Sequence, residues 1–298
     1  MKPFTSYIEC GYCGKYYTSS PEKLAGGKKV QKWFCYTKRT KCPCPTKRRY
    51  IPEFVLTDLV CDVLNIEEYD VKANETAKIL HSLKINLNFA PVADVSSNQK
   101  SFIYSRTLGL DYQQTADCIQ AEILAIHGSQ VAASLKHFPG YGTVGDTHTG
   151  IASTNKSLKD FEKNDFLPFK AGIKAGAQMV LVSHIFVNSI DPNYPASLSP
   201  KIHQLLRQKL HFKKVIITDD LPMGAITQFA VKKHVSADLL AVKAGNDMLL
   251  SNDISVGVPL IRQAVNKQQI KETQINASVY RILKLKRDLG ILNKMDFR

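Results

Sequence analysis

The chain has 298 residues, 44% of them apolar, which is enough for a sizeable core in one large barrel domain or two ordinary domains. No apolar run reaches the length of a bilayer span, and residues 1–15 lack the apolar centre of a secretory signal. Seven cysteines are too few for a disulfide-stapled scaffold, so we expect a reducing, cytoplasmic location. The composition thus excludes membrane-spanning and disulfide-rich classes, and no membrane partner is expected.

The formal net charge of +14 is concentrated at one end of the chain. Residues 1–50 contain twelve Lys or Arg against two acids, Glu9 and Glu22, and they hold five of the seven cysteines. After residue 50, the proportions of basic residues and cysteines become ordinary. We therefore divide the chain into a basic, cysteine-rich segment at residues 1–65 and a globular domain at residues 66–298.

From residue 67 onward, helical and strand-like patterns alternate. Short apolar, β-branched runs predict buried strands that start near residues 85, 131, 177, 214 and 246. Apolar spacings of three and four predict helices over residues 72–84, 112–127, 158–175, 202–210, 236–244 and 274–289. The first two helices should bury Ala77, Leu80 and Leu83, and Ala116, Ile119, Ile123 and Ile126, respectively. Consecutive strand starts lie 32 to 46 residues apart, the length of a strand–helix unit, so the sheet should be parallel.

Two of the predicted strands break into loops that carry ionisable side chains. The strand near residue 131 is followed by Lys136, His137, Asp146 and His148, and the strand near residue 214 ends in Asp219 and Asp220. Loops after the carboxyl ends of parallel strands share one face, where ligands bind. A carboxylate facing a His/Asp pair can perform nucleophilic attack with proton transfer. The pattern therefore indicates an enzyme.

Seven short motifs from these loops and strands occur in a fixed order. They are NLNFAPVADV, SRTLGLD, KHFPGYG followed by DTH, LVSHI, PASLSP, ITDDLPMGAI and AGNDMLL. Over about residues 66–292 the chain resembles the glycoside hydrolase family 3 β-N-acetylhexosaminidases, in particular the single-domain type that acts on cell-wall fragments. The resemblance implies a TIM-type (β/α)8 barrel. It also implies retaining hydrolysis of terminal N-acetylglucosamine from peptidoglycan fragments, without a metal or other cofactor.

The resemblance also implies roles for individual residues. Asp219 matches the nucleophile, which would form a covalent glycosyl-enzyme. His148 matches the general acid/base and Asp146 its partner, an arrangement that differs from the usual pair of carboxylates. An imidazole suits this role because it gains and loses a proton near neutral pH. The matching substrate-binding positions are Arg106, Lys136 and His137.

These residues could instead have purely structural roles. Asp219 and Asp220 could cap the helix that follows them. Lys136 and His137 could simply end a strand, and Arg106 could tie down a loop. His184, at the end of LVSHI, is equally suited to lining the pocket or filling the core.

Several features depart from the family pattern. A D-x-E-G-G-x-V segment, whose aspartate holds sugar hydroxyls, has no good match in residues 1–65. The most similar stretch is KLAGGKKVQK at residues 23–32, which lacks the acidic residues of that segment. Tyr141 stands where the family usually has a histidine, and the loop before Asp146 is one residue shorter. Five strands are evident where a closed barrel needs eight. We therefore expect a barrel that is incomplete or atypical at its N-terminal strands.

Two accounts of residues 1–65 compete. Cys10-x2-Cys13 and Cys42-x-Cys44, with Cys35 nearby, loosely match a zinc ribbon that could bind nucleic acid. The C-x-C spacing is poor and strand signals are weak, so nucleic acid is the less favoured partner. The favoured account is that the first barrel strands are absent or scrambled, for example by a change of reading frame. Three functions stay open: an active exo-β-N-acetylglucosaminidase, an impaired remnant of that fold, and a nucleic-acid-binding protein.

Overall fold

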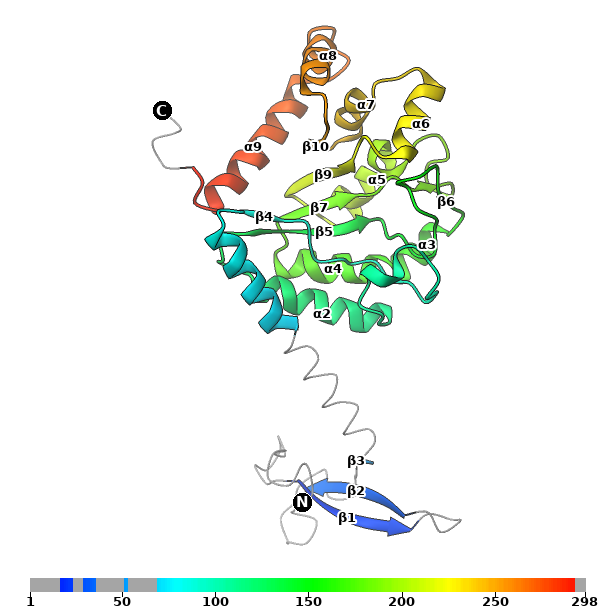
Figure 1. The fold of residues 1–298 in the computed structure, drawn as a ribbon, viewed down its shortest axis with the longest axis vertical. Coiled ribbons are helices and arrows are strands. Elements are labelled where there is room, and N and C mark those ends of the chain that lie inside the picture. Colours follow the sequence, from blue (N-terminus) through cyan, green and yellow to red (C-terminus); the bar gives the residue numbers. More distant parts are fainter. Residues whose placement is uncertain (1–16, 24–28, 36–50, 53–68, 293–298) are drawn as a thin grey trace. The chain divides into compact units, whose positions relative to one another are not determined.

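The computed structural model describes residues 17–23, 29–35, 51–52 and 69–292. The chain divides into two compact units, Met1–Glu68 and Tyr69–Arg298 (Figure 1). The sequence-based boundary after residue 65 falls close to this division, in a stretch outside the described residues. The KLAGGKKVQK stretch at residues 23–32 lies partly outside the described residues as well.

The first unit contains a small antiparallel sheet. β1 (Tyr17–Lys23) pairs with β2 (Lys29–Cys35), and β3 (Ile51–Pro52) pairs with the other edge of β2. The register places Tyr17 opposite Cys35. The sequence interpretation found only weak strand signals here and was wrong on that point, because YTSSPEK lacks the apolar alternation of a half-buried strand. These three strands pair only with one another among the described residues, so they do not extend the parallel sheet.

The second unit is built on a parallel sheet in the order β10-β9-β7-β5-β4. Its strands are β4 (Leu87–Asn88), β5 (Ala132–Phe138), β7 (Met179–Val182), β9 (Val215–Asp220) and β10 (Met248–Leu250). This parallel order confirms the prediction made from strand spacing. The sheet curls into a half-barrel whose edges, among the described residues, are β4 and β10. A closed barrel is not formed by these five strands.

Helices follow most strands. They are a helix at 69–82, α2 (Tyr112–Ala125), α3 (Leu158–Lys163), α4 (Phe166–Ala175), α5 (Pro200–Gln204), the π-helical turn η4 (Leu205–Lys209), α6 (Gly224–Lys233), α7 (Ala237–Ala244), α8 (Ile254–Asn266) and α9 (Glu272–Asp288). Short elements complete the unit: η2 (Tyr104–Arg106), η3 (Ala196–Leu198), β6 (Ser153–Thr154) and β8 (Phe186–Val187). No helix of the described residues is long and apolar enough to cross a bilayer.

Alternate residues of the strands pack into two different apolar layers, as the period of a strand requires. Leu135, Val180 and Ile216 belong to the layer shared with α2 and α4, which lie side by side along β5 (Figure 1). The other layer comprises Met179, Leu181, Val215 and Ile217, against which Ile282 and Leu285 of α9 pack. The curled sheet is thus covered by helices on one face and partly covered by α9 on the other.

Three details differ from the sequence expectations. Leu83 is 64% exposed because the first helix ends at residue 82 and Leu83 lies in the turn beyond it. The helix expected over residues 158–175 is divided into α3 and α4 at the buried Asp165. Helices α6 and α8 were not predicted. The four core positions predicted for the second helix are buried as expected, and Gly290, just after α9, adopts a positive φ.

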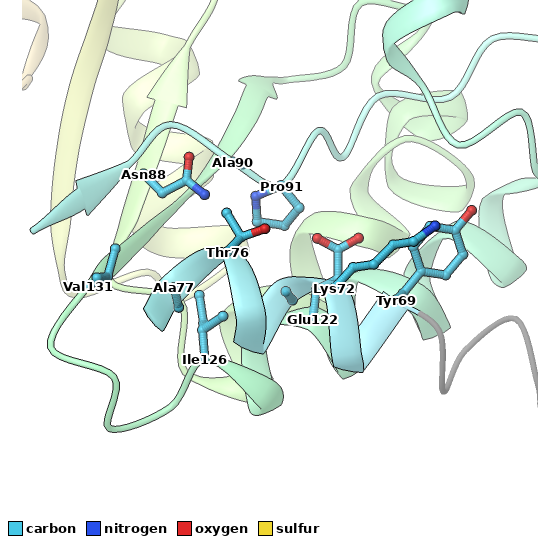
Figure 2. A pocket seen from close by; sticks show the side chains of 11 residues that line it. Tyr69, Lys72, Thr76, Ala77, Asn88, Ala90, Pro91, Glu122, Ile126 and Val131 are labelled. Atoms are coloured by element: carbon cyan, nitrogen blue, oxygen red, sulfur yellow. The ribbon is translucent and has the colours of Figure 1, made fainter. Parts of the chain in front are cut away.

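A cavity of about 200 Å³ lies between the helix at 69–82, α2 and the segment after β4 (Figure 2). One wall is apolar, with Ala77, Ile126 and Val131, and Glu122 of α2 contributes a carboxylate to the lining. Burial raises the pKa of Glu122 to about 7, and the nearby charge of Asp70 adds to the effect. This cavity contains none of the residues predicted to perform chemistry.

The raised pKa of Glu122 predicts a pH-dependent stability. The folded state binds the proton more tightly than the unfolded chain, so stability should fall as pH rises from 4.5 towards 7. Glu122→Gln should flatten this slope. Above pH 7 its free energy of unfolding should exceed that of the wild type by about 3 kcal/mol. Urea titrations between pH 5 and 8 measure the difference, with the exposed Glu75→Gln as a control. Parallel pH profiles for wild type and Glu122→Gln would show that this carboxylate is not responsible.

Candidate active site

The end of β5 is fixed by a buried aspartate, Asp94, from the segment after β4. Oδ2 of Asp94 accepts hydrogen bonds from the backbone nitrogen of His137 at 3.1 Å and from its Nδ1 at 2.6 Å. Oδ1 of Asp94 accepts from the backbone nitrogen of Tyr141 at 2.7 Å. Asp94 and His137 are 1% and 3% exposed. Because a carboxylate only accepts, Nδ1 of His137 carries the proton and Nε2 faces outward as an acceptor.

Two basic side chains flank this pair. Arg106, at the end of η2, approaches Nε2 of His137 with its Nη2 at 3.3 Å. Lys136 is half-buried, and desolvation lowers its pKa, with the positive charge of Arg106 acting in the same direction. The carboxylates of Asp219 and Asp94 oppose this lowering. The three predicted substrate-binding residues therefore lie together, and Lys136 is within electrostatic reach of Asp219.

The loop after β5 carries the predicted acid/base pair. Oδ1 of Asp146 accepts from Nδ1 of His148 at 2.6 Å and from its backbone nitrogen at 2.9 Å. Desolvation acts to raise the pKa of Asp146, but the hydrogen bonds from His148 and the charge of Arg106 outweigh it and hold the pKa below its ordinary value. The His148 side chain is 54% exposed. Its Nδ1 is thus fixed by an anion, which leaves Nε2 to exchange a proton with a ligand.

The same loop is attached to the start of α6. The backbone nitrogens of Gly224 and Ala225 donate to the carbonyl oxygens of His148 and Thr147, each at 3.1 Å. The side chain of Gln228 donates to the carbonyl oxygen of Thr149 at 3.2 Å. Since α6 follows β9 directly, the position of His148 is linked to the strand end that carries Asp219.

Asp219 and Asp220 end β9 in different environments. Asp219 is half-buried and its Oδ1 accepts from the backbone nitrogen of Asp220 at 2.9 Å, whereas the Asp220 side chain is exposed. The fully buried His184 donates from Nε2 to the carbonyl oxygen of Asp220 at 2.9 Å, while its Nδ1 lies 2.8 Å from Oγ of Ser197. Burial lowers the pKa of His184, with the two aspartates opposing the change. His184 therefore lies in the core, where it holds the strand end.

The structure brings all six predicted site residues to one end of the sheet, around the loops after β5 and β9. Their electrostatic links join Arg106 to Asp146 and Lys136 to Asp219. Within the described residues, no group of three or more His, Cys, Asp or Glu side chains is arranged to hold a metal ion. The independence from metal implied by the resemblance remains a prediction.

Sequence reasoning did not single out Asp94 or the contact between Tyr141 and Thr147. Asp94 follows an apolar run in the segment after β4, so the rule that identified Asp219 could also have identified Asp94. The partner of Tyr141 had no comparable signal, because a tyrosine and a threonine six residues apart in a loop carry no recognisable spacing.

Comparisons with known proteins agree with this geometry. Residues 62–285 match the glycosyl hydrolase family 3 N terminal domain. A beta-hexosaminidase from Xanthomonas oryzae pv. oryzae is 38% identical over 169 residues, 56% of this chain and 49% of the relative. One from Stenotrophomonas maltophilia is 39% identical over 143 residues, 47% of this chain and 42% of the relative. The chain thus spans about half the length of the curated relatives it matches.

Solved structures of family 3 enzymes are also similar to this chain. A family 3 beta-N-acetylglucosaminidase from Paenibacillus sp. aligns with a TM-score of 0.72 and 29% identity, covering 76% of this chain and 44% of that one. A family 3 glycosyl hydrolase from Mycobacterium smegmatis aligns with a TM-score of 0.67 and 28% identity, covering 76% and 71%. The family match covers well over half of the residues and includes the loops after β4, β5 and β9. The chain therefore belongs to glycosyl hydrolase family 3.

Proposed function

We propose that the protein is a retaining exo-β-N-acetylglucosaminidase. The observation that carries the proposal is the tie between the His148–Asp146 pair and the start of α6, a few residues after Asp219. It holds a proton donor and a carboxylate at one site, which is what glycoside hydrolysis through a covalent intermediate needs. The names of the family 3 relatives supply the sugar class.

In the first step, a carboxylate oxygen of Asp219 attacks the anomeric carbon of a terminal N-acetylglucosamine. The bond from that carbon to the aglycone oxygen breaks, and His148 gives its Nε2 proton to the departing oxygen. The product is a glycosyl ester of Asp219. The anionic Asp146 supports this step because it stabilises the imidazolium that donates the proton and fixes the ring through Nδ1.

In the second step, His148 removes a proton from a water molecule, which attacks the anomeric carbon. The ester bond to Asp219 breaks and the sugar leaves with its original β configuration. Arg106, Lys136 and His137 bind hydroxyl groups of the sugar, since they lie together and Lys136 is within electrostatic reach of Asp219.

Three finer points belong to the same proposal. The substrate class is an N-acetylglucosamine-containing fragment of peptidoglycan, on the strength of the motif resemblance. The five-stranded sheet corresponds to part of a TIM-type (β/α)8 barrel, with β4, β5, β7, β9 and β10 as five of its strands. The cysteine usage favours a cytoplasmic site of action.

The acid/base role of His148 predicts a dependence on the leaving group. A nitrophenol departs without protonation, whereas a sugar alcohol needs a proton. His148→Ala should therefore lose about 10²-fold or more in kcat on a disaccharide or alkyl N-acetylglucosaminide, and much less on a nitrophenyl one. Steady-state kinetics on the two substrates measure the difference.

The exposed His211→Ala provides a histidine control that should match the wild type on both substrates. Equal losses on both substrates in His148→Ala would assign the histidine a role other than proton donation. A folded wild-type protein without activity on either substrate would contradict the proposed function itself.

A second candidate function concerns residues 1–68. The antiparallel sheet of β1, β2 and β3 favours the zinc-ribbon account, because it is separate from the parallel sheet and β2 ends at Cys35. The other cysteines of that account lie outside the described residues. Under this candidate the basic segment binds nucleic acid through a zinc-stabilised module.

The zinc account predicts stoichiometric zinc in the purified protein, measured by elemental analysis. Binding to duplex DNA should weaken steeply with salt and vanish when residues 1–50 are deleted. EDTA should leave glycosidase turnover intact, because the residues proposed for catalysis do not need the metal. Zinc-free, cooperatively folded protein that binds no nucleic acid would remove this candidate.

A further inference from the structure

Tyr141 lies near the start of the loop after β5 that carries the acid/base pair, at a position where the sequence departs from the family pattern. Its side chain is 2% exposed, and its backbone nitrogen is held by Asp94. It follows the segment that carries Lys136 and His137. Tyr141 is thus anchored to the part of the site that is fixed most firmly by buried hydrogen bonds.

The phenol of Tyr141 reaches across the loop to Thr147. Its oxygen accepts from the backbone nitrogen of Thr147 at 3.1 Å and shares a short hydrogen bond with Oγ1 of the same residue. Thr147 is fully buried and immediately precedes His148. Burial raises the pKa of Tyr141, so the phenol stays protonated and serves as donor and acceptor at once.

Aromatic contacts extend the link to the imidazole. The Tyr141 ring packs edge-on against His137 at 5.7 Å between centroids and lies 5.9 Å from Phe102. Phe102 packs edge-on against His148 at 5.5 Å. Two routes, one through Thr147 and one through Phe102, therefore connect Tyr141 to His148.

We infer that Tyr141 is a positioning residue that clamps the acid/base loop to the floor of the sugar site. Asp94 fixes Tyr141 on one side, and Thr147 transmits its position to His148 on the other. The contacts of Thr147 and His148 with α6 hold the loop from the opposite direction. The inference rests on the proposed function, because the loop that Tyr141 clamps carries His148, the residue proposed to donate the proton.

A structural role alone would lower folding stability and reduce turnover of all substrates alike. A positioning role predicts a selective effect, since only reactions that need protonation depend on the placement of Nε2. Displacement of a catalytic group by about 1 Å is enough to cost about 10²-fold in rate. The leaving-group dependence of turnover therefore separates the two roles.

The test uses Tyr141→Phe in the full chain, which removes the hydroxyl and keeps the ring. We expect kcat on an alkyl or disaccharide substrate to fall about 10- to 100-fold, and kcat on a nitrophenyl substrate to change by less than about threefold. KM should change little on both. Thr147→Val removes only the side-chain contact, so it should give the same pattern with a smaller loss, and the double variant should be no worse than Tyr141→Phe.

Tyr280→Phe, on the exposed part of α9, is the matched control and should match the wild type. Amide hydrogen exchange over residues 142–151 gives a readout that does not depend on activity, and it should be faster in Tyr141→Phe. Unchanged exchange, or equal loss on both substrates, would overturn the inference. If the folded wild type lacks glycosidase activity, the proposed function fails, while the exchange measurement still decides whether the clamp exists.

Discussion

Asp219→Asn is expected to abolish turnover of an aryl β-N-acetylglucosaminide, with a loss of at least about 10³-fold in kcat. The substitution keeps the shape of the side chain and removes the charge that attacks the anomeric carbon. Asp219 is half-buried at the end of β9 and lies within electrostatic reach of Lys136, so its carboxylate lies beside a predicted substrate-binding residue. Initial rates with nitrophenyl substrate measure the loss directly.

The neighbouring carboxylate supplies the comparison for this test. The Asp220 side chain is exposed, and it is the backbone carbonyl oxygen of this residue that contacts the buried His184. Asp220→Asn retains that oxygen. Asp220→Asn should therefore lose far less activity than Asp219→Asn. The reverse ranking would show that Asp220 is the nucleophile and that Asp219 orders the start of the following helix.

Gly224→Ala is expected to reduce kcat by about 10²-fold while leaving the protein folded. A Cβ at this position would lie 2.6 Å from the carbonyl oxygen of His148 and 3.0 Å from the carbonyl carbon of Thr149. Both are backbone atoms, so the loop must move away from α6 to make room. That movement breaks the link between His148 and the end of β9.

Gly145→Ala is the matched control, because it places a methyl group in the same loop where the nearest atom is 4.0 Å away. It should retain nearly wild-type kcat. Circular dichroism and thermal unfolding check that both variants fold. Full activity in Gly224→Ala would show that the contact with α6 does not determine the position of His148.

The sequence predicted the strand ends that carry chemistry because the relevant signal is local. An apolar, β-branched run followed at once by ionisable residues indicates a buried strand that opens into a functional loop. This reasoning located Lys136, His137 and Asp219 correctly at the ends of β5 and β9. The motif order then led to the prediction of a role for His148, which the local pattern alone would have left as an ordinary loop histidine.

The features that were not predicted depend on contacts between distant parts of the chain. Asp94 acts on His137, 43 residues later, and no periodic pattern records such a pairing. The amphipathic pattern predicted α9, but it did not show that Ile282 and Leu285 pack against the apolar layer that contains Met179 and Ile217. The β1–β2 pair was missed because its strands lack the apolar alternation that usually indicates a strand.

The configuration of the first-formed sugar tests the central claim most directly. Attack by Asp219 followed by attack of water inverts the anomeric carbon twice, so the account predicts retention. Proton NMR of a reaction with nitrophenyl β-N-acetylglucosaminide, recorded before mutarotation, should show the β-anomer of N-acetylglucosamine appearing first. Appearance of the α-anomer first would contradict a covalent intermediate on Asp219 and the mechanism built on it.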